Sequence, residues 1–268
     1  ARPLRSLSKL YEVSASCNFF LKNMHFMICK ILYDIKRSSV SNGKLLYINI
    51  DIRYGGLVHD IMSAQVQESL VELAGAKGCA GVFSQMDCSP WSALKFNQPG
   101  PPILFDVSNP DGIMSADKLL PPETKQAMML VALNVRLADA VIGHDGFFLL
   151  ERPAIQSSGH FANKSLPDHS TITETSLMRE LAQKHGLVDV HLEQCMHGAS
   201  SRKPTSVLCS ATILRPMRRA VGTKLCNHNG HAGDTVGFDE DGKSRAAKTR
   251  EYPPVLCGLF AYAMVETH

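Results

Sequence analysis

Short apolar runs along the chain alternate with stretches in which apolar positions recur at helical spacing. The runs LLYINI (45–50) and GCAGVFS (78–84) are rich in aliphatic residues and end at polar positions, which predicts buried strands. Later runs have the same character and predict three further strands: GFFLLE (146–151), LVDVHL (187–192) and SVLCSAT (206–212).

The stretches between these runs predict helices and one long loop. Residues 63–78 have helical periodicity with a glycine-rich exit, and residues from about 173 to 185 form another helix that Gly186 closes. A third helix begins at the Pro-Pro-Glu of 121–123 and keeps one apolar face. Residues 97–122 are rich in Pro, Gly, Asn and Asp, which predicts a long loop.

This alternation predicts an α/β fold, with a mostly parallel sheet and helices on both faces. Ligands of such sheets bind beyond the carboxyl ends of the strands. Asp51, the turn at 84–92 and Glu151 all fall at such ends, which indicates a site there. We expect an α/β domain over residues 1–215 and an irregular, basic C-terminal region over 216–268 that packs on the same domain.

Charge and cysteine content narrow the classes of partner. The net charge is only +3, but residues 202–250 hold ten Lys and Arg against four acids. That stretch is a candidate surface for nucleic acid, and a solvated basic loop explains it about as well. No apolar run is long enough for a membrane span. The eight cysteines include no C-x-x-C, so we expect reduced thiols and an intracellular protein.

The first ten residues, ARPLRSLSKL, are basic and free of acids. Such a composition is typical of the remnant of an organelle-targeting segment, and a fragment boundary explains it equally well. The expected location is therefore the nucleus or an organelle such as the mitochondrion.

Several motifs occur in a characteristic order. Cys88-Ser-Pro-Trp-Ser follows a predicted strand, and Glu151-Arg-Pro follows another. Further along, a segment begins at Cys195 and ends in Lys203-Pro-Thr. A Cys-x-His-x-x-His segment follows at 226–231, and a Tyr-Pro pair at 252–253. From about residue 7 to residue 262 this order resembles the C5-cytosine DNA methyltransferases, and most closely a divergent, often retroelement-associated branch. Gly100-Pro101 matches that branch's loop after the nucleophile.

The resemblance implies a role for each motif. Cys88 would add to C6 of a cytosine that has left the duplex, and Glu151 would hydrogen-bond the N3 and amino edge of the base. Arg202 or Lys203 would hold the flipped nucleotide. The implied cofactor is S-adenosylmethionine, with these candidate binding residues: Glu12, Ser14, Asn49, Asp51 and Asp60.

Four departures from the family pattern lie in the same implied site. The first cofactor loop, here at 12–18, has no glycine, and Asn49 replaces the ribose-binding acid unless Asp51 substitutes for it. Asp87 precedes the nucleophile and would raise the pKa of its thiol. Arg152 follows Glu151 and could pair with it.

These departures predict a catalytically impaired methyltransferase-like protein. It would act as a structural or nucleic-acid-associated subunit of a larger assembly. The alternative is an active S-adenosylmethionine-dependent DNA cytosine methyltransferase with Cys88 as nucleophile.

Simpler explanations stand beside these roles. A free cysteine is usually a small buried apolar residue, so Cys88 is also explained as a structural thiol, and Trp91 as a packing residue. Cys226, His228 and His231 are possible zinc ligands, with a distant fourth at Cys195, Cys209 or Cys257. Their spacing matches no strong zinc pattern, so we expect a polar loop without a metal.

Overall fold

The computed structural model describes residues 60–91, 102–154, 170–222, 225–231, 240 and 252–267, and the backbone of two further strands. Those two strands are β1 (Phe26–Leu32) and β2 (Lys44–Ile50). Four more complete the sheet: β3 (Cys79–Gln85), β4 (Phe147–Pro153), β5 (Val188–Glu193) and β6 (Pro204–Cys209). All five strands predicted from the sequence are present, within a few residues of the expected bounds.

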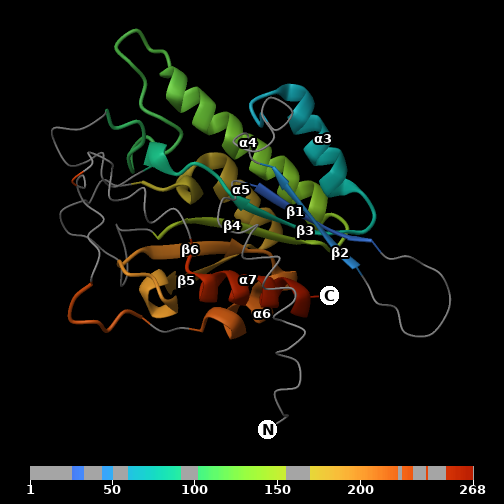
Figure 1. Ribbon diagram of the computed structural model, residues 1–268. Helices are drawn as coiled ribbons and strands as arrows, with labels where there is room; N and C mark the ends of the chain where they lie inside the picture. Colours follow the sequence, from blue (N-terminus) through green and yellow to red (C-terminus); the bar gives the residue numbers. More distant parts are fainter. Residues whose placement is uncertain are drawn as a thin grey trace, which may run out of the picture.

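The six strands form one mixed sheet in the order β2-β1-β3-β4-β6-β5 (Figure 1). Only the β3–β4 pair is parallel, so the prediction of a mostly parallel sheet is wrong. One reason lies in the link between β5 and β6, residues 194–203, which is shorter than the crossover that a parallel pair needs. Since β6 is antiparallel to both neighbours, β3, β4 and β5 still point the same way, and their carboxyl ends share one edge.

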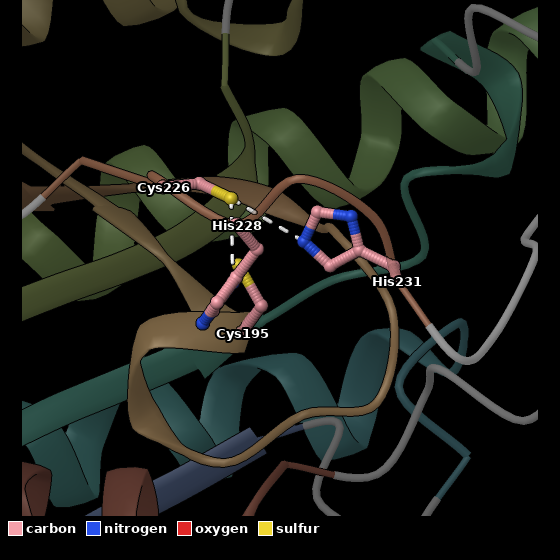
Figure 2. A group of neighbouring side chains, drawn as sticks. All are labelled: Cys195, Cys226, His228 and His231. Atoms are coloured by element: carbon pink, nitrogen blue, oxygen red, sulfur yellow. Dashed lines mark hydrogen bonds between the residues drawn. The ribbon is translucent and has the colours of Figure 1, made fainter.

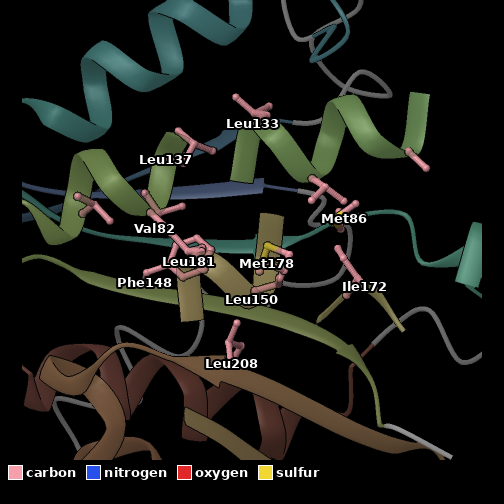
Figure 3. Packing of buried hydrophobic residues seen from close by; sticks show 14 of the residues in the cluster. Val82, Met86, Leu133, Leu137, Phe148, Leu150, Ile172, Met178, Leu181 and Leu208 are labelled. Carbon is pink, nitrogen blue, oxygen red and sulfur yellow. The ribbon is translucent and has the colours of Figure 1, made fainter. Parts of the chain in front are cut away.

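Three helices cover one face of the sheet: α3 (Ala64–Gly75), α4 (Pro122–Ile142) and α5 (Ser176–His185). Alternate residues of the strands face this layer because side chains along a strand alternate between faces. Figure 3 shows the resulting core, in which strand residues Val82, Phe148, Leu150 and Leu208 meet Leu133, Leu137, Met178 and Leu181 of the helices. The chain leaves α5 through Gly186 in the left-handed conformation (φ 59°), as the sequence predicted.

Two helices lie against the opposite face, α6 (Ala211–Val221) and α7 (Pro254–Glu266). The end of α6 and the whole of α7 lie in residues 216–268, where we expected an irregular region. In α7 the apolar residues surround the whole helix, so they give no helical periodicity in the sequence, as is typical of a buried helix. Its Phe260 packs edge-on against Phe83 of β3 and against Tyr252, with ring centroids 5.6 Å apart in both pairs.

The loop between β3 and α4 contains a residue that stabilises a distant helix. Asp111 accepts hydrogen bonds from the backbone N–H of Ser176 (2.7 Å) and from its hydroxyl (2.5 Å), at the first turn of α5. We expect Asp111→Ala to lower the free energy of unfolding by about 1 kcal/mol, because a helix N-terminus loses its capping carboxylate. Urea denaturation measures this change. Asp117→Ala, which removes an exposed acid of the same loop, is the control and should change it by less than about 0.5 kcal/mol.

Candidate functional site

The turn after β3 positions Cys88, and Asp87 builds that turn. The Asp87 carboxylate accepts hydrogen bonds from the Ser89 backbone N–H (3.0 Å) and from the Ser89 hydroxyl (2.8 Å). The backbone N–H of Trp91 then donates to the backbone carbonyl of Cys88 (3.0 Å), which closes the short helical turn Ser89–Trp91. Asp87, which departs from the family pattern, thus has a structural role in shaping this turn.

Trp91 is a packing residue. Its ring is buried and stacks on Phe105, with centroids 4.5 Å apart and an interplanar angle of 22°. It anchors the Cys88 turn to the loop that follows, so the simpler explanation of this tryptophan is confirmed.

Glu151 lies at the carboxyl end of β4 and is buried, with 4% of its surface exposed. Its Oε1 atom has no hydrogen-bond partner among the described residues, and the Lys203 Nζ lies 4.0 Å from it. The same Lys203 ammonium lies 5.9 Å from the centre of the Tyr252 ring. A buried carboxylate, a lysine and a tyrosine from three separate segments are therefore neighbours.

The thiol of Cys88 belongs to this group. Burial, the most important cause, and the charge of Glu151 raise the pKa of Cys88 to about 11, and Asp87 contributes in the same direction. Lys203 opposes them. The sequence prediction that Asp87 would disfavour the thiolate has the right sign, but burial and Glu151 are the larger causes.

The sequence places Tyr252 only in a Tyr-Pro pair and predicts no role for it. Its hydroxyl is buried, and burial together with the charge of Glu151 raises its pKa well above the ordinary value. Tyr252 and Cys88 also influence each other electrostatically. The Tyr-Pro pair at 252–253 was the one sequence signal for this residue.

A small, partly open pocket lies beside Cys88 and Glu151. Its walls combine the apolar Met86 and Trp91 with polar groups at the ends of the strands. The complete lining is Met86, Cys88, Trp91, Glu151, Arg152, Pro153, Thr171 and Ile172. The predicted site at the carboxyl ends of the strands therefore coincides with a real concavity.

Arg152 forms its ion pair with Asp189 of β5 rather than with Glu151. Its Nη2 atom lies 2.6 Å from the Asp189 Oδ2, and its side chain is 1% exposed. Successive residues of a strand point to opposite faces, so Arg152 lies on the face of α4 and α5 while Glu151 lies on the other. The expectation that Arg152 pairs with Glu151 is wrong for this reason.

Arg202 and Lys203, the two candidates for holding a nucleotide, have different partners. The Arg202 guanidinium binds the fully buried Glu193 through two nitrogens, with its Nη2 2.8 Å and its Nε 3.1 Å from the Glu193 Oε1. Hydrogen bonding to Glu193 raises the pKa of Arg202. Of the two, Lys203 is the residue placed at Glu151 and Cys88.

Most of the candidate cofactor residues lie outside the described part of the structure. These are Glu12, Ser14 and Asp51, and for Asn49 only the backbone in β2 is described. Asp60 precedes α3, and its Oδ1 accepts a hydrogen bond from the Met62 N–H (3.0 Å). The described residues thus do not by themselves form a site that fits S-adenosylmethionine.

Away from the pocket, the three weak zinc candidates lie together with Cys195. The Cys226 Sγ is 3.3 Å from the His231 Nε2 and 3.5 Å from the His228 Nδ1. Figure 2 shows all four side chains pointing toward one another, from the turn after β5 and from residues 226–231. The sequence named Cys195 as one of three possible fourth ligands, and the structure selects it for this cluster.

Comparisons with protein-family models, with curated proteins and with solved structures give no match. The class that the structure itself shows is α/β with a mixed sheet. Among the described residues, no helix combines the length and apolar character needed to cross a bilayer. The six described cysteines are all free thiols.

Proposed function

We propose that this chain is a C5-cytosine methyltransferase-like protein that binds nucleic acid through a nucleobase pocket and is impaired as a catalyst. It acts as a nucleic-acid-associated subunit of a larger assembly. The observation that carries the proposal is the convergence of Cys88, Glu151 and Lys203 at one end of the sheet. The resemblance gave these three residues roles at the same cytosine.

The chemistry of the pocket suits a pyrimidine. The Glu151 carboxylate is buried at the wall of the pocket beside the Lys203 ammonium, and its Oε1 atom can accept a hydrogen bond from a polar ligand there. The exocyclic amine of cytosine is a hydrogen-bond donor that carboxylates accept. Met86 and Trp91 supply apolar walls, and the Lys203 ammonium provides a positive charge beside the site for a phosphate or a base oxygen.

Nucleic acid could approach over a basic surface. Arg215, Arg218 and Arg219 are exposed on α6, and Arg202 is 45% exposed on the link between β5 and β6. These residues belong to the stretch that the sequence marked as basic. Arg219 is partly neutralised by Glu266, from which it lies 2.9 Å, so the other arginines would contribute more.

The state of the thiol supports impairment. A thiolate, and not a thiol, adds to a carbon centre. With a pKa of about 11, only about one Cys88 in 10,000 is ionised near pH 7. Asp87 and Glu151 both add to this effect, and no step of the proposal depends on the cofactor, for which the described residues show no complete site.

A cofactor-free test follows from the reversible addition of Cys88 to cytosine. The sulfur forms a bond to C6, and C5 takes a proton from water. Loss of the original C5 proton and cleavage of the sulfur–C6 bond then restore the base. We expect a single-stranded oligonucleotide carrying tritium at cytosine C5 to lose it slowly at about pH 7 and about 100-fold faster at about pH 9. Cys88→Ser should abolish the release at both values.

The same experiment separates the two functional hypotheses. Fast release at neutral pH, with calorimetric binding of S-adenosylmethionine, would favour the active methyltransferase. Slow tritium release at neutral pH, together with tight oligonucleotide binding that weakens in Lys203→Ala, supports the hypothesis of a catalytically impaired protein. Absence of binding to any cytosine-containing oligonucleotide contradicts both.

A further inference from the structure

We propose that Cys195, Cys226, His228 and His231 form a structural zinc site. One sulfur or nitrogen atom from each residue lies within 4.8 Å of all the others. Two thiolates and two imidazoles are a ligand set that zinc binds in structural sites, with four protein ligands and no open position. The site lies outside the nucleobase pocket and does not depend on the function proposed for it.

The distances around Cys226 fit a tetrahedral ion. Zinc–sulfur bonds of about 2.3 Å and zinc–nitrogen bonds of about 2.0 Å place neighbouring ligand atoms roughly 3.3–3.8 Å apart at the corners of a tetrahedron. The Cys226 sulfur lies 3.3 Å and 3.5 Å from the nitrogens of His231 and His228. The two imidazole rings are nearly perpendicular, at 88°, with centroids 5.4 Å apart, so they do not stack on each other.

Hydrogen bonds also link the four residues. Cys226 contacts both imidazoles, and its sulfur can donate to one ring nitrogen and accept from the other. Cys195, which is buried and comes from a distant segment, is hydrogen-bonded to Cys226. In a zinc site all four residues would be ligands of one ion. A shared cation accounts for all four positions at once.

The place of the cluster in the fold indicates what the ion would stabilise. Cys195 lies in the short helix Gln194–His197, directly after β5. From there the chain turns back toward β6, and the Gln194 N–H donates to the Lys203 carbonyl (3.2 Å). An ion bound to Cys195 and to residues 226–231 would therefore join the chain after α6 to the link that carries Arg202 and Lys203.

The test is the zinc content of the full chain, purified without chelators from zinc-supplemented cells and measured by mass spectrometry of the metal. We expect one zinc per chain in the wild type and in Cys88→Ser, a matched control that removes a thiol outside the cluster. Cys226→Ser and His231→Asn, both in the 225–231 segment, should each lose most of it. Removal of zinc by a chelator should lower the Tm by about 5 °C or more.

Cobalt substitution provides a second readout that does not depend on recovery of bound zinc. Cobalt in a tetrahedral site with two thiolates gives visible ligand-field bands and a sulfur-to-metal charge-transfer band, and both should weaken in Cys195→Ser. Several outcomes overturn the proposal: wild-type protein that binds neither metal, zinc that persists in all the cluster variants, or a Cys195–Cys226 disulfide in place of the metal. Circular dichroism confirms that each variant is folded.

Discussion

Asp189→Asn should lower the free energy of unfolding by about 3–5 kcal/mol, the largest loss of stability that we expect from one substitution on the sheet. The Arg152 guanidinium is 1% exposed and lies 2.6 Å from the Asp189 carboxylate. Without that carboxylate, the buried cation loses its one ion-pair partner among the described residues and keeps only the weaker electrostatic influence of Glu174 and Glu151. Urea denaturation followed by circular dichroism measures the change.

Two companion variants distinguish this effect from a general loss of a salt bridge. Glu68→Gln removes an ion pair of the same length, 2.6 Å, to Arg136 on the surface, where both side chains are well exposed. It should cost less than about 1 kcal/mol. The double variant Arg152→Met with Asp189→Leu should recover most of the stability, because it removes the buried charge together with its half-buried partner. If Asp189→Asn is as mild as Glu68→Gln, the Arg152 charge is not buried as described.

Cys88 should react with iodoacetamide about 100-fold more slowly near pH 8 than an ordinary protein thiol. Its pKa is raised from 9.0 to about 11, so at any pH below both values the reactive thiolate is about 100 times rarer. The rate should rise tenfold for each pH unit and level off only near pH 11. Mass spectrometry of the peptide that contains Cys88 follows this reaction separately from those of the other thiols.

Neighbouring charges should change this rate in opposite directions. Glu151→Gln removes a negative charge, which lowers the pKa of Cys88 and accelerates alkylation, and Asp87→Asn should do the same to a smaller extent. Lys203→Met removes a positive charge and should slow it further. Equal rates in wild type and Glu151→Gln would show that the two side chains are not electrostatic neighbours, and the proposed site would lose its main support.

The hydrophobic pattern was sufficient to locate the strands, because each is a short apolar run that ends at polar residues. It did not reveal strand direction. A β6 inserted antiparallel between β4 and β5 has the same local sequence pattern as a parallel strand, since direction depends on the connections. The helix α7 was missed because its apolar residues lie all round the helix, which leaves no polar face to give a period.

The sequence predicted the position of the candidate site better than it predicted which side chains interact with one another. Cys88 and Glu151 were expected at strand ends and are both in the pocket. The partner of Arg152 could not be foreseen, because Asp189 is 37 residues away and only the sheet register brings it close. The same holds for the cluster around Cys226, in which local spacing could not choose among the distant cysteines.

The insertion of β6 between β4 and β5 has a consequence during synthesis. Until residue 209 has left the ribosome, β4 lacks its neighbour on that side and β5 lacks its one partner among the described strands. Unpaired strand edges with apolar side chains are a route to aggregation, so the growing chain passes through a vulnerable period that ends only when β6 arrives. The face that α7 covers waits longer still, until residues 254–266 have been synthesised.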